Sequence, residues 1–599
     1  MKPILNKIAI IAGLSLLASC QSFFDEDPVY STTTDTFFNS ETALETYAIG
    51  FLESHLPSAA TLTRGDQYSD ICVTTQTEGF LKTGGYSAQQ ANNWARGNWR
   101  PLYNVNYYLK HMKDAAPYVD DATMKHYEGV GRFWRAWFYW DKVKTFGDVP
   151  WYAKPLGSAD PELKRPRDSR EFVMQRMIED IDFAIRYLPA ERDLYRVTKW
   201  TALALKSRFC LFEGTFRKYH SIDGYEHDWK WYLEQAADAA EEFITNSGYS
   251  LYTATGPATS YRDLFASENA QSVEVILARD YNSALGVFHN ANFYTISASY
   301  GKPGMTRKIV DSYLMADGSR FTDKAGWETM EFKQQCSNRD PRLAQTIRTP
   351  GYTRIGATTK LAPDLANSIT GYHVVKFVTG TAQDAYNKSF NDLPIFRSAE
   401  VYLNFAEAKA ELGTLTQEDI NLSVKRLRDR VGMSNLILDD ANKNPDPYLS
   451  DAKTGYPNVT GANKGVILEI RRERTIELAM EGFRYYDIMR WKEGKTFEQP
   501  LLGLYIPAKG EYDIDGDGTP DVYFATKGET PSTTAKLTLV IDQDILFSDG
   551  DHGYISPHKN NPGIWDETRD YFYPIPTDDR SLTGGALTQN PGWNDGLNF

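Results

Sequence analysis

Cysteine is scarce in this chain, with four residues among 599, at positions 20, 72, 210 and 336. The three that follow Cys20 are far apart in the sequence. An odd number of widely spaced cysteines predicts neither a disulfide framework nor a zinc site. Cys210 lies inside an apolar helical pattern, which predicts a buried, small hydrophobic side chain.

An excess of positive charge and the familiar catalytic motifs are also missing. The formal net charge is −14, and nucleic-acid binding needs a basic surface, so nucleic acid is excluded as a partner. The sequence contains no nucleophile elbow, phosphate loop, HExxH motif or dinucleotide fingerprint. We therefore expect a protein that is not an enzyme. With 79 acidic residues, a carboxylate pair spaced for glycoside hydrolysis arises easily by chance, so a surface glycoside hydrolase stays open as the alternative.

The only long apolar run lies at the N-terminus. Residues 8–17 are too few to span a bilayer, and they follow Lys2 and Lys7, as in a signal peptide. The next residues, Leu-Ala-Ser-Cys at 17–20, look like a bacterial lipobox. We predict a lipoprotein signal peptide at 1–19, a lipidated Cys20 that anchors the chain stably, and a polar tether that continues to residue 40. The alternative is a chance cysteine after an ordinary signal peptide.

Helical periodicity dominates the first half and returns after residue 397. Paired segments with alanine contacts suggest tetratricopeptide-like stacking. Residues 250–395 are instead rich in Gly, Pro, Ser, Thr and aromatics, with strands expected at Val273–Ala278 and His373–Val378. We divide the mature chain into parts 41–250 and 251–599, packed together. The predicted helices are Thr42–Leu56, Trp99–Lys113, Asp121–Thr145, Ser169–Leu188, Lys199–Arg217, Asp228–Thr245, Ser398–Leu412, Thr416–Val431 and Ile467–Trp491.

The last of these predicted helices has an unusual charge pattern. Glu473, Glu477 and Glu481 form an i, i+4 row of like charge, which weakens an isolated helix by about 0.2–0.5 kcal/mol per pair. Gly482 in the middle of the helix costs roughly 1 kcal/mol relative to alanine. A helix that breaks two local rules depends on close tertiary neighbours, so we predict an internal ion network here.

Several segments resemble one family, in that family's order. ERTIELAMEGFRYYDIMRW, at residues 473–491, resembles the signature helix of the SusD/RagB family, the lipid-anchored nutrient-binding proteins of the Bacteroidetes outer membrane. RFWRAWFYWDKVKTFGDVPW, at 132–151, resembles another of its helices. Further matches lie at 202–214, 339–342, 393–413, 573–576 and 589–593. The resemblance implies a mostly α fold, a single globule in which tetratricopeptide-like helix pairs form a scaffold under a loop-rich ligand-binding face.

The resemblance also implies a function. A member of this family is expected to capture an oligosaccharide or polysaccharide at the cell surface and to hand it to a SusC-like TonB-dependent transporter. Its place is the outer membrane, held by the lipid on Cys20. Besides the hydrolase, two alternatives remain: a binder of peptide or another nutrient on the same scaffold, and a transporter lid without a ligand of its own.

Two loop regions have the composition of a glycan site. Such a site needs exposed aromatic faces to stack on sugar C–H groups, and amides, carboxylates or arginines to bond the hydroxyls. Residues 66–99 and 280–300 meet this composition, and the resemblance places the ligand face in roughly these regions. For each chosen residue the alternative is packing against the scaffold. The candidate ligand-binding residues are Trp94, Arg96, Tyr281, Asn282, Tyr294 and Tyr300.

An Asp-rich stretch near residue 515 resembles the front of a calcium loop. Oxygen ligands at alternate positions, with glycine at the sixth, are typical of such loops. The twelfth position holds Phe524 where a bidentate Glu is usual, so another ligand has to come from elsewhere or from water. We predict a structural Ca²⁺ that stiffens the loop, with a plain Asp-Gly turn as the alternative. The candidate ligands are Asp513, Asp515, Asp517, Thr519 and Asp521.

Overall fold

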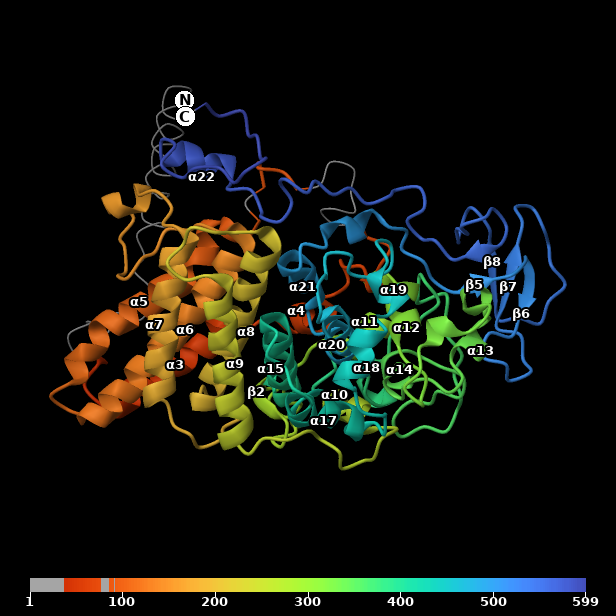
Figure 1. Cartoon of the computed structure of the whole chain (residues 1–599), viewed down its shortest axis with the longest axis horizontal. Coiled ribbons are helices and arrows are strands. Elements are labelled where there is room, and N and C mark those ends of the chain that lie inside the picture. Colours follow the sequence, from red (N-terminus) through yellow and green to blue (C-terminus); the bar gives the residue numbers. More distant parts are fainter. Residues whose placement is uncertain (1–36, 77–85, 91, 599) are drawn as a thin grey trace, which may run out of the picture.

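The computed structural model describes residues 37–76, 86–90 and 92–598. The predicted signal peptide and Cys20 lie outside this range. The N-terminal part is a stack of helices, drawn in red to yellow in Figure 1. Side-chain oxygens of Ser40, Asp120, Ser169, Thr198 and Asp228 accept backbone N–H groups at the starts of five of them, which explains where these helices begin. The helices are α3 (Glu41–His55), α4 (Ala59–Arg64), α5 (Arg100–His111), α6 (Asp121–Phe146), α7 (Arg170–Tyr187), α8 (Lys199–His220) and α9 (Trp229–Asn246).

Helices of this part pack in pairs, as the sequence predicts. α6 packs on α7 and α8 on α9, and α15 (Ser398–Leu412) then packs on α9. Close helix contact needs small residues at the interface. A Cβ on Gly214 of α8 would lie 2.7 Å from the Leu233 side chain of α9. The pairs therefore continue without a break into the C-terminal part, and one large apolar core runs from Phe38 to Leu587.

The middle of the chain has short elements joined by long loops, shown from yellow-green to cyan in Figure 1. Strand β2 (Val275–Arg279) confirms the predicted strand and pairs antiparallel with β4 (Leu393–Arg397). The strand predicted at 373–378 is wrong, because only residues 373 and 374 form isolated bridges there. The remaining elements are α10 (Ser260–Ala266), α11 (Ala291–Ile296), β3 (Gly304–Met305) with its partner β1 (Cys72–Val73), α12 (Arg307–Ser312), α13 (Phe332–Gln335) and α14 (Arg342–Thr346).

The helix predicted at 416–431 is interrupted. It consists of α16 (Gln417–Leu422) and α17 (Val424–Arg430), with Ser423 in a non-helical conformation between them. The Ser423 hydroxyl donates to the Asp419 carbonyl. Serine hydroxyls that bond back to the helix backbone bend or break helices, which accounts for the interruption.

The helix predicted at 467–491 is also two helices. α20 (Lys464–Glu477) ends at a turn, and α21 (Arg484–Arg490) follows it. Met480 and Gly482 both have positive φ, of 67° and 82°, a conformation that a helix cannot contain. Gly482 is therefore a turn residue, and its predicted cost inside a helix is wrong. It is also a contact point, because a Cβ on Gly65, after α4, would lie 2.4 Å from the Gly482 Cα.

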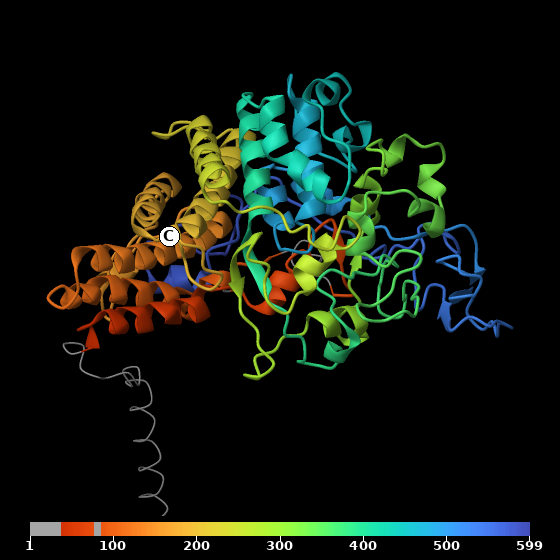
Figure 2. The same cartoon turned by 90° about the horizontal axis from the view of Figure 1, so that it is seen from below.

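The C-terminal region returns to the N-terminal helices. Its small sheets lie at the far right of Figure 1, whereas α22 (Thr577–Leu582) lies at the opposite end, and Figure 2 shows the blue chain among the orange helices. Tyr573 N donates to the Thr145 carbonyl at the end of α6, and Thr577 N donates to the Ala88 carbonyl. One sheet consists of β5 (Tyr505–Ile506) and β9 (Gly553–Tyr554). The other has the strand order β6 (Gly510–Tyr512), β7 (Val522–Ala525), β8 (Leu537–Val540). Short α18 (Leu438–Lys443) packs on α20, and α19 (Pro447–Ser450) follows it in the chain.

Candidate functional site

The row of glutamates around α20 lies in the interior of the protein. Glu477 is fully buried, and Arg342, Arg397 and Arg430 approach its carboxylate oxygens to 3.3, 2.7 and 2.6 Å. Burial alone would raise the pKa of Glu477, but the three guanidinium groups hold it well below its ordinary range. This confirms the predicted internal ion network, which is part of the scaffold.

Glu473 and Glu481 also have cationic partners, some of them shared with Glu477, so the row is not a repulsive helix face. Arg428 Nε lies 2.6 Å from Glu473 Oε1, and Arg397 and Lys376 each lie 2.7 Å from Glu481 Oε1. Every carboxylate of the row is thus matched by cations from other elements. Matched, buried charges of this kind hold the segments in register.

The predicted ligand residues lie in three places. Trp94 is 3% exposed and packs between Trp99 and Phe146, at ring-centroid distances of 5.1 and 4.9 Å. Arg96 follows two residues later and is exposed. In this conformation the Trp94 ring has no face open to a ligand, so its burial favours the alternative of packing against the scaffold. Contact between a ligand and Arg96 stays a prediction.

Tyr281 and Asn282 begin a small hairpin. Tyr281 is buried, and its ring lies 4.5 Å from the His289 ring, so packing is favoured for it too. Asn282 is exposed, but its Oδ1 accepts the N–H groups of Ala284 and Leu285 and thereby closes the hairpin turn. The structure thus gives Asn282 a role in shaping the loop, and ligand contact by this residue stays a prediction.

Tyr294 and Tyr300 come together around Arg64. The Arg64 guanidinium carbon lies 5.0 Å from the Tyr294 ring centroid and 4.3 Å from that of Tyr300. Such a distance permits cation–π attraction. Tyr294 is buried, and its hydroxyl donates to Gln67 Oε1 at 3.1 Å, so it forms the floor of the group. Tyr300 is only half-buried and forms part of the rim.

Two further aromatic rings complete this group. Phe293 stands edge-on to Tyr300 at 5.7 Å and to Tyr386 at 5.5 Å. Tyr386 is 63% exposed, although it is a large aromatic side chain. Partial burial and the neighbouring Tyr386 hydroxyl raise the pKa of Tyr300, so Tyr300 stays a neutral hydrogen-bonding hydroxyl at physiological pH. We call Arg64, Phe293, Tyr294, Tyr300 and Tyr386 the Arg64 aromatic cluster.

The loops that carry the cluster are tied to each other. His289 and Ser389 form an antiparallel bridge, and the Asn387 N–H donates to Asn290 Oδ1. Sequence reasoning missed Tyr386 and Arg64. Tyr386 lies in a loop of mostly small and polar residues that offered no periodic signal. Arg64 ends a short helix more than two hundred residues away in sequence from the rings it contacts.

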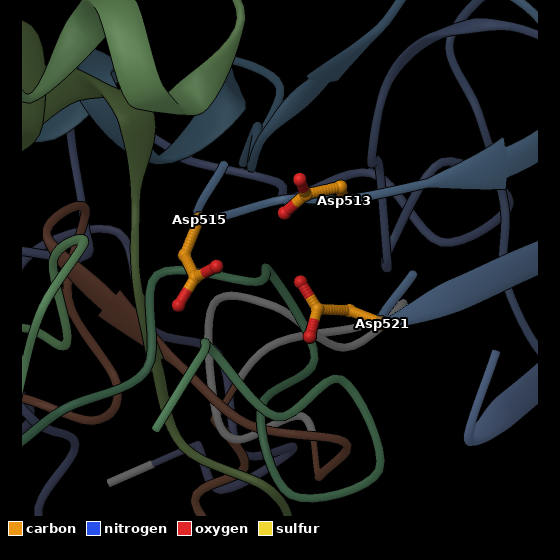
Figure 3. Close-up of side chains that lie close together, drawn as sticks. All are labelled: Asp513, Asp515 and Asp521. Atoms are coloured by element: carbon orange, nitrogen blue, oxygen red, sulfur yellow. The ribbon is translucent and has the colours of Figure 1, made fainter. Parts of the chain in front are cut away.

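The Asp-rich loop brings three of its carboxylates together, as Figure 3 shows. One oxygen from each of Asp513, Asp515 and Asp521 lies within 4.8 Å of the other two. Asp517 is not part of this group, and its Oδ1 instead accepts the Thr519 N–H at 2.7 Å. Burial and the charges of Asp517 and Asp513 raise the pKa of Asp515, and burial with Asp515 and Asp513 raises that of Asp521.

Sequence comparison identifies the scaffold. A family profile described as "SusD family" matches residues 264–593, more than half of the chain. The chain belongs to the SusD family. A second profile, described as "Starch-binding associating with outer membrane", matches residues 22–211 of this SusD family member. The family predicted from the motifs is therefore confirmed.

Relatives and solved structures agree over nearly the whole SusD-like chain. It is 24% identical to SusD-like protein P2 of Formosa agariphila, covering 82% of this chain and 92% of the relative. It is 23% identical to a SusD-like protein of Bacteroides ovatus, with 98% and 97% covered. A crystal structure of a SusD-like protein from Bacteroides fragilis matches with a TM-score of 0.70 at 21% identity, covering 95% and 100% of the two chains.

Another structure from Bacteroides fragilis bears the name SusD-like carbohydrate binding protein. It matches with a TM-score of 0.65 at 19% identity and covers 91% of this chain and 99% of its own. At such identities the likeness establishes the fold. It confirms the predicted mostly α architecture with a scaffold of helix pairs.

Proposed function

We propose that this SusD family member is a cell-surface glycan-binding lipoprotein that captures oligosaccharides on the Arg64 aromatic cluster. The exposure of Tyr386 next to Phe293 and Tyr300 is the observation that carries the proposal. Aromatic rings give sugars a flat apolar surface, and the tyrosine hydroxyls can bond sugar hydroxyls. The Arg64 guanidinium packs against the Tyr300 ring in the rim of this surface. The family's carbohydrate-binding members support the same class of ligand.

The test compares two tyrosines of nearly equal exposure. Tyr386 is 63% exposed and Tyr118, which belongs to the connection between α5 and α6, is 65% exposed. We expect Tyr386→Ala to weaken polysaccharide binding at least about fivefold, roughly 1 kcal/mol, in affinity electrophoresis and calorimetry. Tyr118→Ala should bind as the wild type does. Equal affinity in both variants would contradict the proposed site, and binding of peptides by a protein that retains no glycan would favour the alternative nutrient.

The proposed function involves binding without a chemical step. Incubation with the polysaccharides that the protein binds should release no reducing sugar. Sustained release that disappears on substitution of a single carboxylate would replace the proposal with the glycoside hydrolase alternative.

We further propose that the protein is held in the outer membrane by lipid on Cys20 and delivers its ligand to a SusC-like TonB-dependent transporter. Within the range that the structure describes, no helix has the length and apolar character needed to cross a membrane. Cys20→Ala should release the protein from the membrane fraction, and the wild type should co-purify with the transporter. Wild-type uptake of the bound glycan by cells with Tyr386→Ala would favour a lid without a ligand of its own.

The predicted structural Ca²⁺ also remains a proposal, now with a smaller ligand set. Asp513, Asp515 and Asp521 converge, and a divalent cation would offset the burial and the mutual repulsion that raise the pKa of Asp515 and Asp521. The remaining oxygens have to come from backbone or water. We expect Ca²⁺ to raise the melting temperature of the wild type but not that of Asp515→Asn. Asp551→Asn, a substitution of an exposed acid, is the control and should respond to Ca²⁺ as the wild type does. A wild-type melting temperature that is the same with Ca²⁺ and with EGTA would refute the site.

A further inference from the structure

A cavity lies between the N-terminal helices and the turn after α20, and no residue of the Arg64 aromatic cluster lines it. Its volume is about 540 Å³, within the range of small-molecule sites. Side chains of α6, α8 and α21 form its walls, and residues 481–483 of the turn close one side. Ser54 and Gly97, which are exposed, mark its opening to solvent. A monosaccharide or disaccharide would fit such a volume.

The walls of this cavity combine rings and charges. Four of the rings are Trp137 and Trp140 of α6, Phe212 of α8 and Tyr486 of α21. Cationic side chains outnumber acidic ones among the lining residues. The cations are Lys142, Lys144, Arg208, Arg397, Arg474 and Arg490, and the acids are Asp141, Glu400, Glu481 and Asp487.

All four lining carboxylates already have cationic partners. Lys144 Nζ lies 3.2 Å from Asp141 Oδ1, and Arg208 contacts both oxygens of Glu400 at 2.6 Å. Glu481 binds Arg397 and Lys376, and Asp487 binds Arg474 and Arg490. An anion entering the cavity would therefore meet no unpaired carboxylate, and the hydrogen-bonding capacity left for a ligand is mainly that of donors.

Lys142 is the cation without a carboxylate of its own. It is 1% exposed, and its ammonium group donates to the Asn93 carbonyl, but no carboxylate among the described residues forms an ion pair with it. The neighbouring Asp141 is occupied by Lys144 and Asn93. Burial lowers the pKa of Lys142 to about 8, so at neutral pH it is still mostly charged. The charge of Asp141 favours the charged form of Lys142 without forming an ion pair with it. A buried charge without a contacting counter-ion is costly, and a bound anion would supply one.

One lining group is suited to a hydroxyl. His55 Nδ1 lies 3.1 Å from the Phe51 carbonyl, whereas its Nε2 is buried and has no partner among the described residues. Burial lowers the pKa of His55 to about 4, so the ring is neutral. With Nδ1 donating to the carbonyl, Nε2 is left as an acceptor for an O–H group.

We propose that this cavity binds a sugar-sized ring that carries an anionic group, either the carboxylate of a hexuronate or the sulfate of a sulfated pyranose. Lys142 meets the anion, the tryptophans of α6 pack on the ring, and His55 accepts a hydroxyl. The choice of a sugar as the ligand rests on the proposed function, whereas the anionic group follows from the lining charges. The cavity is a second site, distinct from the Arg64 aromatic cluster.

Calorimetric titration of the full-length mature protein with glucuronate, glucose 6-sulfate and uncharged glucose tests this. We expect one or both anionic sugars to bind at least tenfold more tightly than glucose, and the two arms show which anion is preferred. Lys142→Met keeps the apolar stem and should abolish this preference. The proposal would be overturned if neither anionic sugar binds, or if both bind no more tightly than glucose.

A second variant, at the opening of the cavity, tests the proposal independently of any folding defect in Lys142→Met. A Cβ on Gly97 meets nothing within 4 Å, so Gly97→Trp should fold and obstruct entry, lowering the affinity for the anionic sugar at least tenfold. Gly157→Trp, at an equally open exposed glycine outside the lining, is the matched control and should bind normally. Unchanged affinity in Gly97→Trp would overturn the proposal. Tyr386→Ala should leave this binding intact, so failure here is distinguishable from failure of the aromatic cluster.

Discussion

Glu493 is a buried carboxyl group with weak electrostatic compensation. Arg471 Nη1 lies 3.7 Å from its Oε1, a loose contact, and the Asn458 N–H donates to the same oxygen at 3.2 Å. Burial outweighs both partners and raises the pKa of Glu493 to about 7. The ionised form is therefore less stable in the folded protein than in the unfolded chain.

The raised pKa of Glu493 makes the folded protein less stable as pH rises. Between pH 4.5 and 7 the unfolded chain releases this proton while the folded protein retains it, so the stability contributed by Glu493 is present at low pH and is lost as pH rises through this window. We expect the free energy of unfolding of Glu493→Gln, taken relative to that of the wild type, to be about 1–3 kcal/mol higher at pH 8 than at pH 5. Urea unfolding at both pH values measures this difference. Parallel pH profiles of the two proteins would contradict the raised pKa.

The turn between α20 and α21 depends on close contact with the end of α4. A Cβ on Gly65 would lie 2.4 Å from the Gly482 Cα, closer than any side chain tolerates, so the backbones have to move apart. We expect Gly65→Ala to lower the free energy of unfolding by roughly 1–3 kcal/mol, as other overpacking substitutions do. Gly50→Ala, in the middle of α3 with open space around it, should instead raise it by about 0.5–1 kcal/mol. Thermal unfolding of both variants tests the contrast, which equal shifts would refute.

At the same element, the ion network predicts a large cost for removing one carboxylate. Glu477→Gln would leave Arg342, Arg397 and Arg430 without their shared anion, and breaking a buried pair in this way costs about 3–5 kcal/mol. Asp429→Asn removes an exposed i, i+4 partner of Lys425 and should cost less than about 1 kcal/mol. Chemical denaturation distinguishes the two, and a cost for Glu477→Gln as small as that of the control would show that the network is not a stabilising unit.

Elements differ in how far the sequence predicts them. The helices of the N-terminal part follow from periodicity and from caps such as Ser169 and Asp228, because both signals are local. The break after Glu477 does not follow, because it depends on the contact between Gly482 and Gly65. The Arg64 aromatic cluster was half predicted: Tyr300 lies in a loop of the expected composition, but Arg64 and Tyr386 join it only through tertiary packing.

At the scale of the whole molecule, two buried histidines hold together the loops around the Arg64 aromatic cluster. His289 Nε2 lies 2.9 Å from the Asn391 carbonyl, and its Nδ1 accepts the Ala291 N–H. His373 Nε2 lies 2.7 Å from the Thr295 carbonyl, and its Nδ1 accepts the Asp364 N–H. A proton on Nδ1 would point at an N–H group in both cases. Burial accordingly lowers the pKa of His289 to about 4 and that of His373 to about 3.

This arrangement predicts that acid destabilises the whole fold. As pH falls below 6.5, histidines of the unfolded chain bind protons, whereas His289 and His373 stay neutral in the folded protein. The stability that they contribute above pH 6.5 is therefore lost progressively, down to about pH 4 for His289 and about pH 3 for His373. In this range each histidine lowers the free energy of unfolding by about 1.4 kcal/mol per pH unit. Asp66 and Glu493 offset part of this loss, because their pKa values are raised to about 6 and about 7 and they stabilise the folded protein as pH falls. We expect the loss of stability between pH 7 and pH 5, from denaturant unfolding, to shrink by about 2 kcal/mol in His373→Gln. The exposed His552→Gln should keep the wild-type loss, and an equal loss in all three proteins would contradict a neutral His373.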